Sequence, residues 1–126
     1  MYFENYNANP NNKKTGDCVV RALSKALDKS WDVVYMDLCE IGFELKVMPN
    51  DDECYMEYLK SKGFTKETIK VTKGSKRPTV TSFTKEHQEG TYILRVANHL
   101  VTVKDGKYFD IWDSGSCCLY GFWKIK

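Results

Sequence analysis

The sequence predicts an α+β fold in which N-terminal helices pack on a C-terminal antiparallel sheet, within a single domain of residues 1–126. Three observations lead to this prediction. Apolar residues recur at helical spacing before Thr91, strand-forming residues dominate after it, and no internal repeat or linker interrupts the chain. A chain of 126 residues that is 42% hydrophobic and 13% aromatic suits one modest core.

The N-terminal part is expected to begin without regular structure. Residues 1–14 are polar and rich in asparagine, and we expect an irregular lead-in laid over the surface. Apolar spacing predicts a first helix over residues 18–27 and a second over residues 31–41. Asp17 and Ser30 precede them, and each is expected to cap its helix by accepting hydrogen bonds from the first turn.

The middle of the chain is expected to finish the helical half. A third helix is predicted over residues 50–62, where Asn50 and Glu53 have the spacing of a capping box. A short strand over residues 69–72 and a short helix over residues 79–87 are expected to follow.

The C-terminal part has the composition of a sheet. From Thr91 onward the apolar runs are rich in β-branched and aromatic residues, and the last strand is expected over residues 119–125. Asp105-Gly106 lies between two such runs and predicts a two-residue hairpin turn, in which Lys104 pairs with Lys107.

The register of this hairpin predicts a pair of polar neighbours. Because side chains alternate along a strand, His99, Asp110 and Trp112 fall on one face. Asp110 is then the diagonal neighbour of His99, within side-chain reach, whereas Asp113 points to the other face. Trp112 is placed to shield the pair from water.

Cys18 has the properties of a nucleophile. At the first position of a helix, the positive end of the helix dipole favours the thiolate, and free backbone N–H groups can receive an oxyanion. Together with a His99–Asp110 pair, Cys18 completes a set of nucleophile, base and orienting carboxylate. The alternative is that Cys18 and His99 are ordinary core residues and that Asp110 is a turn carboxylate.

This layout resembles the papain-like cysteine peptidases, in which the nucleophilic cysteine starts a long helix. A histidine follows on a strand, then an asparagine or aspartate on the next strand, often two residues before a tryptophan. Cys18, His99 and Asp110, in Asp110-Ile111-Trp112, match these positions. The chain is also similar to compact bacterial C39-like peptidases and to short proteins of bacteriophages and prophages of Gram-positive bacteria, which share its Thr-Gly-Asp-Cys-Val-x-Arg-Ala segment and its Ala-Asn-His-Leu strand.

The resemblance implies further site residues. The family places a side-chain amide before the cysteine as an oxyanion donor, and Asn12 is the best positional match, with Asn9 and Asn11 as alternatives. Two further candidates come from the residues themselves and not from the resemblance. Trp112, on the face of His99, and Arg21, one turn after Cys18, are candidate substrate-binding residues, although Arg21 is alternatively a surface arginine. The activity implied is hydrolysis or acyl transfer at an amide or thioester bond of a peptide or protein. The alternative is a non-catalytic phage-encoded protein that keeps the fold and blocks a host factor.

Composition and charge argue against other classes. The net charge of +2 and the lack of a basic stripe with aromatics speak against nucleic acid. The sequence has no membrane-length apolar run and no signal peptide, so we expect a cytoplasmic protein. The resemblance to phage proteins implies that the cytoplasm is that of a bacterial host, and no cofactor is expected. The odd number of widely spaced cysteines indicates a reducing compartment. Adjacent Cys117 and Cys118 lack the usual spacing of zinc ligands.

Overall fold

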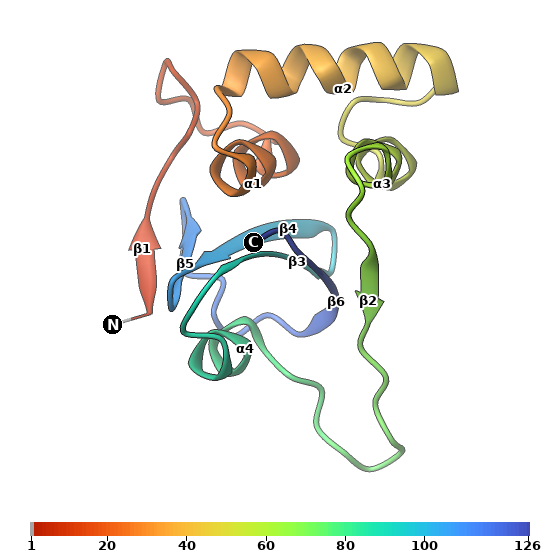
Figure 1. The fold of residues 1–126 in the computed structure, drawn as a ribbon. Helices are drawn as coiled ribbons and strands as arrows, with labels where there is room; N and C mark the ends of the chain where they lie inside the picture. The colour runs from red at the N-terminus through yellow and green to blue at the C-terminus, as the bar shows by residue number, and fades with distance from the viewer. Residues whose placement is uncertain (1) are drawn as a thin grey trace.

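The computed structural model describes residues 2–126, which form an α+β fold of four helices and a six-stranded mixed sheet (Figure 1). The helices are α1 (Cys18–Leu27), α2 (Trp31–Leu45), α3 (Asp52–Ser61) and α4 (Val80–Glu86). The strands are β1 (Phe3–Asn5), β2 (Lys66–Thr68), β3 (Thr91–Val96), β4 (His99–Lys104), β5 (Lys107–Asp110) and β6 (Leu119–Lys124), in the sheet order β1-β5-β4-β3-β6-β2.

Two expectations were wrong at one edge of the sheet. The sheet is not wholly antiparallel, and part of the lead-in forms a strand. β1 comes from the lead-in and pairs with β5 in parallel, with Phe3 opposite Tyr108. The Tyr108 backbone N–H donates to the Tyr2 carbonyl at 2.8 Å, and the Phe3 and Tyr108 rings pack with centroids 5.6 Å apart. An uncovered β5 would expose unpaired backbone groups, and β1 satisfies them. A strand of three residues is too short to show periodicity in the sequence.

Two helix boundaries also differ from the prediction. α2 runs on to Leu45, because Gly42 lies inside the helix rather than at its end. A Cβ on Gly42 would approach the Val47 carbonyl oxygen to 2.7 Å. The absence of a side chain at this position therefore lets the following loop pack closely against the helix. α3 is capped by Asp51, whose side chain accepts from the Glu53 N–H at 2.9 Å, and not by Asn50.

The remaining elements follow the predictions more closely. α1 has the predicted bounds, and the Ser30 hydroxyl accepts from the Val33 N–H as an N-cap should. Thr79 and Ser82 form a reciprocal capping box at α4. The expected strand over residues 69–72 was wrong, because these residues form no strand and the short strand of this region is β2, Lys66–Thr68.

The sheet separates two cores. α1, α2 and α3 cover one face, with α2 as the outer layer over α1 and α3, and α4 covers the other face (Figure 1). Ile93 faces the helical layer, whereas Leu94 faces α4, as strand alternation requires. Among residues 2–126, no helix combines the length and the apolar character needed to cross a bilayer.

Candidate active site at the start of α1

The packing of α1 on the sheet sets the position of Cys18. Within the buried layer the Thr102 hydroxyl of β4 donates to the Ala22 carbonyl of α1 at 2.6 Å, which fixes the helix over this strand. Cys18 is the first residue of α1, and His99 is the first residue of β4. The two therefore meet at one end of the helix–sheet interface, and both side chains keep partial exposure.

Asp17 does not have the predicted capping role. Its backbone lies at φ −106° and ψ 27°, and its side chain makes no cap hydrogen bond to α1. The carboxylate instead forms an ion pair with Arg21 and accepts from Trp31 Nε1 at 2.9 Å and Asn9 Nδ2 at 3.3 Å. One of these donors is a buried cation, whose charge-assisted hydrogen bond is stronger than one from a backbone N–H, and it competes successfully for the carboxylate.

The predicted proximity of His99 and Asp110 is confirmed. Asp105 and Gly106 have φ values of 48° and 79°, as a two-residue hairpin turn requires, and Lys104 pairs with Lys107. His99 Nε2 lies 2.6 Å from Asp110 Oδ2. Asp113 accepts a hydrogen bond from the hydroxyl of Tyr108 instead.

Asp110 is buried and saturated with donors. Its Oδ2 also accepts from the Ser114 hydroxyl at 2.8 Å, and its Oδ1 accepts from the Ile111 N–H at 2.8 Å and lies 3.5 Å from Arg21 Nη2. Burial alone raises the pKa of a carboxyl, but the hydrogen bonds and the charge of His99 outweigh it and hold the pKa of Asp110 below its ordinary value.

Cys18 and His99 shift one another's pKa values in opposite directions. Burial raises the pKa of Cys18, but its hydrogen bonds to His99 and to the Leu100 backbone, with the charges of His99 and Arg21, bring it below the ordinary value. Burial lowers the pKa of His99, but hydrogen bonds to Asp110 and Cys18 raise it to about 9. Both shifts favour a thiolate beside an imidazolium.

A cavity of about 190 Å³ opens beside this pair. Its wall includes Cys18 and His99, and its polar lining is formed by Asn50, Asp52, Tyr55, Arg95 and Asn98. Arg95 bridges two of these residues, because it pairs with Asp52 and donates from Nε to the Tyr55 hydroxyl at 3.0 Å. The cavity therefore joins the Cys18 thiol to a polar, partly charged recess.

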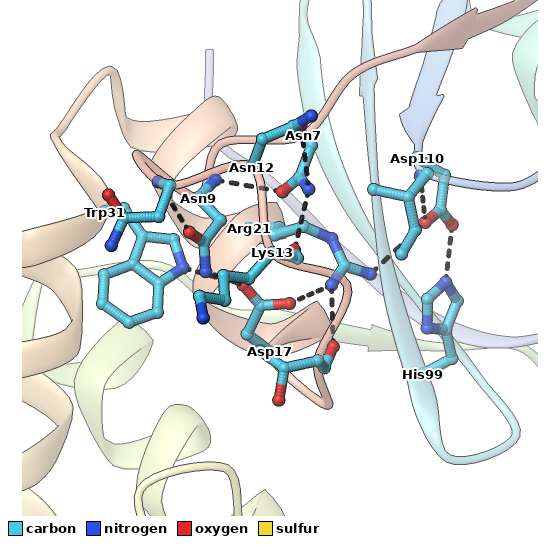
Figure 2. Close-up of polar contacts among 12 residues, drawn as sticks. Asn7, Asn9, Asn12, Lys13, Asp17, Arg21, Trp31, His99 and Asp110 are labelled. Carbon is cyan, nitrogen blue, oxygen red and sulfur yellow. Dashed lines mark hydrogen bonds and ion pairs between the residues drawn. The ribbon is translucent and has the colours of Figure 1, made fainter.

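The two peripheral residues of the expected site lie differently. Asn12 is exposed, has a left-handed backbone with φ 53° and contacts Asn7 (Figure 2). It is not part of the cavity wall. The Trp112 ring centroid lies 5.2 Å from that of His99, at an interplanar angle of 35°. Trp112 therefore covers one side of the imidazole, while 47% of its own surface stays open.

Arg21 is neither on the surface nor free to meet a substrate. Its side chain is only 7% exposed, and its guanidinium lies between the carboxylates of Asp17 and Asp110 (Figure 2). Asp17 and Arg21 are four residues apart on one helix face, which is a recognisable spacing for an ion pair. The contribution of Ser114 had no comparable signal, because it depends on the course of the chain after β5.

The arrangement does not point to a bound metal. Within residues 2–126, no group of three or more histidine, cysteine or acidic side chains is placed to hold a metal ion. Comparison of the chain with protein-family models, with curated proteins and with solved structures gives no match. The interpretation of the site therefore depends on its own geometry.

Proposed function

We propose that this protein is a cysteine hydrolase or acyl-transfer enzyme of the papain-like type, acting on an amide or thioester bond. The observation that carries the proposal is that Cys18 and His99 share the wall of one cavity, while His99 Nε2 lies 2.6 Å from Asp110 Oδ2. The lowered pKa of Cys18, to which His99 contributes, supports it. A helix-start thiol, an imidazole and a buried carboxylate are the groups that nucleophilic acyl chemistry requires.

The chemistry follows from the protonation state of the pair. The Cys18 thiolate attacks the carbonyl carbon, and the backbone N–H at the start of α1 receives the oxyanion. When the intermediate collapses, the leaving group takes the proton of the His99 imidazolium and an acyl-thioester remains on Cys18. Neutral His99 then removes a proton from water, and the hydroxide releases the acid and restores the thiolate. An amine or a thiol in place of water gives transfer instead of hydrolysis.

A second oxyanion donor is needed, and Asn50 fits this role better than Asn12. Asn50 lines the cavity with Cys18, and it also borders the adjoining recess that contains Asp17 and Val20. It therefore lies along the first turn of α1. Asn98, the other side-chain amide of the cavity, directly precedes His99. It therefore lies on the His99 side of the cavity and not at the start of α1. The oxyanion has to be received near the helix start, where the backbone donor lies.

The cavity also limits the substrate. Its volume of about 190 Å³ is below the ~300–1,000 Å³ of pockets that enclose whole drug-sized ligands. We infer that it takes one small or polar group of a longer chain, facing the Asp52–Arg95 pair. A peptide or protein substrate meets this description.

The proposal is tested by direct acylation. The protein is incubated with p-nitrophenyl acetate, and the acetyl group is located by peptide mass spectrometry. We expect acetylation of Cys18 that is lost in Cys18→Ala and strongly slowed in His99→Ala. Cys118→Ala removes an exposed thiol away from the cavity and should leave the rate unchanged. Absence of both a Cys18 adduct and Cys18-dependent release of p-nitrophenolate in the wild-type protein would contradict the proposal and favour a non-catalytic binding protein.

A further inference from the structure

We propose that Arg21 is a positioning residue of this site: its guanidinium bridges Asp17 and Asp110, and so holds the Asp110 carboxylate in the orientation that receives the His99 Nε2–H. The inference rests on the proposed function, because it concerns the base of the same site. Arg21 itself does not line the cavity and is not assigned to contact the substrate.

The first support is burial. The side chains of Asp17, Arg21 and Asp110 are 6%, 7% and 2% exposed, so three ionic groups lie together out of water. Buried charges are stable only when they are paired, and removal of one partner leaves the other unsatisfied. Along this row the charges alternate in sign, and an imidazolium at His99 continues the alternation.

The second support is the division of the guanidinium between two acids. Arg21 Nη1 pairs with Asp17, and Arg21 Nη2 lies 3.5 Å from Asp110 Oδ1 (Figure 2). Asp110 Oδ2, the other oxygen, is thereby left for His99. A planar fork of several donors holds two carboxylates at a fixed distance, which the single ammonium of lysine does not do.

The third support is the anchoring of Asp17. It accepts from Trp31 Nε1 of α2 at 2.9 Å and from Asn9 of the lead-in at 3.3 Å. Arg21 Nη1 also lies 3.4 Å from the Thr15 carbonyl. The bridge thus starts from fixed points in the helical layer and ends on the sheet.

The bridge connects the two elements whose relative position aligns Cys18 with His99 and Asp110. Cys18 belongs to α1, as does Arg21 one turn later, whereas His99 and Asp110 belong to β4 and β5. An ion pair from Arg21 to Asp110 therefore ties the helix of the nucleophile to the strand of the orienting carboxylate. Small displacements between these layers change the distance from thiol to imidazole, to which acyl chemistry is highly sensitive.

The test is the pH profile of Cys18 alkylation by iodoacetamide, measured by peptide mass spectrometry. Arg21→Met and Arg21→Lys are compared with the wild-type protein and with Arg77→Met. Arg77 is a half-buried arginine that contacts the Ile69 and Leu119 carbonyls and lies outside the cavity wall, so it controls for the loss of an arginine as such. Folding of each variant is checked by circular dichroism.

We expect both Arg21 variants to shift the alkylation profile to higher pH, whereas Arg77→Met keeps the wild-type profile. Below the thiol pKa, each unit of upward shift lowers the thiolate fraction about tenfold. The lysine variant keeps the charge, so a shift in it reports lost bridging rather than lost charge. Folded Arg21 variants with the wild-type profile would overturn the inference.

A double-mutant cycle separates action through Asp110 from a direct effect of the Arg21 charge on Cys18. In an Asp110→Asn background, Arg21→Lys should produce little further shift. An equal shift in both backgrounds would overturn the positioning role. If Arg21→Met does not fold, Arg21→Lys and the milder Trp31→Phe, which removes one N–H from Asp17, decide the question by the same criterion.

The two proposals fail in different ways. A wild-type Cys18 that titrates as an ordinary thiol and is not acylated refutes the proposed function. If wild-type Cys18 has a low pKa and the Arg21 variants show the same pH profile of Cys18 alkylation, only the positioning role is refuted.

Discussion

His99 Nε2 lies 2.6 Å from Asp110 Oδ2, and this contact decides which ring nitrogen is available to Cys18. With Nε2–H donated to the carboxylate, Nδ1 is the ring nitrogen left to face Cys18. The imidazole therefore has one fixed partner in the sheet and one reactive partner at the helix start. This orientation is the basis of the catalytic proposal.

The buried bridge should be important for stability. Arg21→Met removes the cation between two buried carboxylates, and loss of one partner of a buried ion pair costs about 3–5 kcal/mol. We expect a decrease of this size in the free energy of unfolding, measured by urea denaturation at pH 7.

The matched control for this loss is Arg77→Met. Arg77 stacks on the Tyr120 ring at 4.4 Å and contacts two backbone carbonyls, and it has no buried acid as partner. Its replacement should lower the free energy of unfolding by no more than about 1 kcal/mol. Equal losses of unfolding free energy in the two variants would mean that the Asp17–Arg21–Asp110 bridge stabilises the fold no more than the contacts of Arg77 do.

The raised pKa of His99 gives stability a defined pH dependence. In Cys18→Ala the thiol is absent, and Asp110 still favours the imidazolium of the folded state. A pKa raised on folding contributes stability that is complete below the unfolded value of about 6.5 and is lost as the pH rises through the folded value. In the intact protein the folded value is about 9. The free energy of unfolding of Cys18→Ala should therefore fall as the pH rises above about 6.5.

The comparison for this measurement is the double variant Cys18→Ala with His99→Gln. Its free energy of unfolding should lack the fall seen in Cys18→Ala, because glutamine does not titrate. The same slope in both proteins would show that the pH dependence arises elsewhere and that the His99–Asp110 pair is not coupled to folding.

The choice of oxyanion donor can be tested by comparing two reactions of the same thiol. Acylation by p-nitrophenyl acetate passes through an oxyanion, whereas alkylation by iodoacetamide does not. Asn50→Ala should slow acylation by about 10²–10³-fold, the usual effect of losing one such donor, and should leave alkylation unchanged. Asn12→Ala should change neither, since Asn12 lies outside the cavity wall. The reverse pattern would return the role to Asn12.

Much of the fold was predictable because it depends on local patterns. The helical spacing of residues 18–27 and the Asp105-Gly106 turn act over a few neighbouring residues, and both predictions were confirmed. The parallel strand β1 was not predictable, since it has three residues and depends on a distant partner, β5. The α+β class was therefore predictable, whereas the mixed character of the sheet was not.

The candidate site divides in the same way. The proximity of His99 to Asp110 followed from hairpin register, which propagates regularly from the turn. The use of Asp17 did not follow, because a residue with the sequence context of an N-cap is instead bound by Arg21 and Trp31. The indole belongs to α2, and its approach depends on how the helices pack. The position of Asn50 in the cavity wall likewise depends on the course of the loop before α3.

The most direct test of the central claim is the pH dependence of Cys18 alkylation in the wild-type protein and in His99→Ala. Exposed Cys118, labelled in the same sample, controls for reagent and access. We predict that Cys18 reacts well below pH 8.5, the pKa of an unperturbed thiol, and that His99→Ala moves its profile to higher pH. Labelling of Cys18 that follows an ordinary thiol profile, unchanged by His99→Ala, would contradict the existence of a thiolate–imidazolium pair.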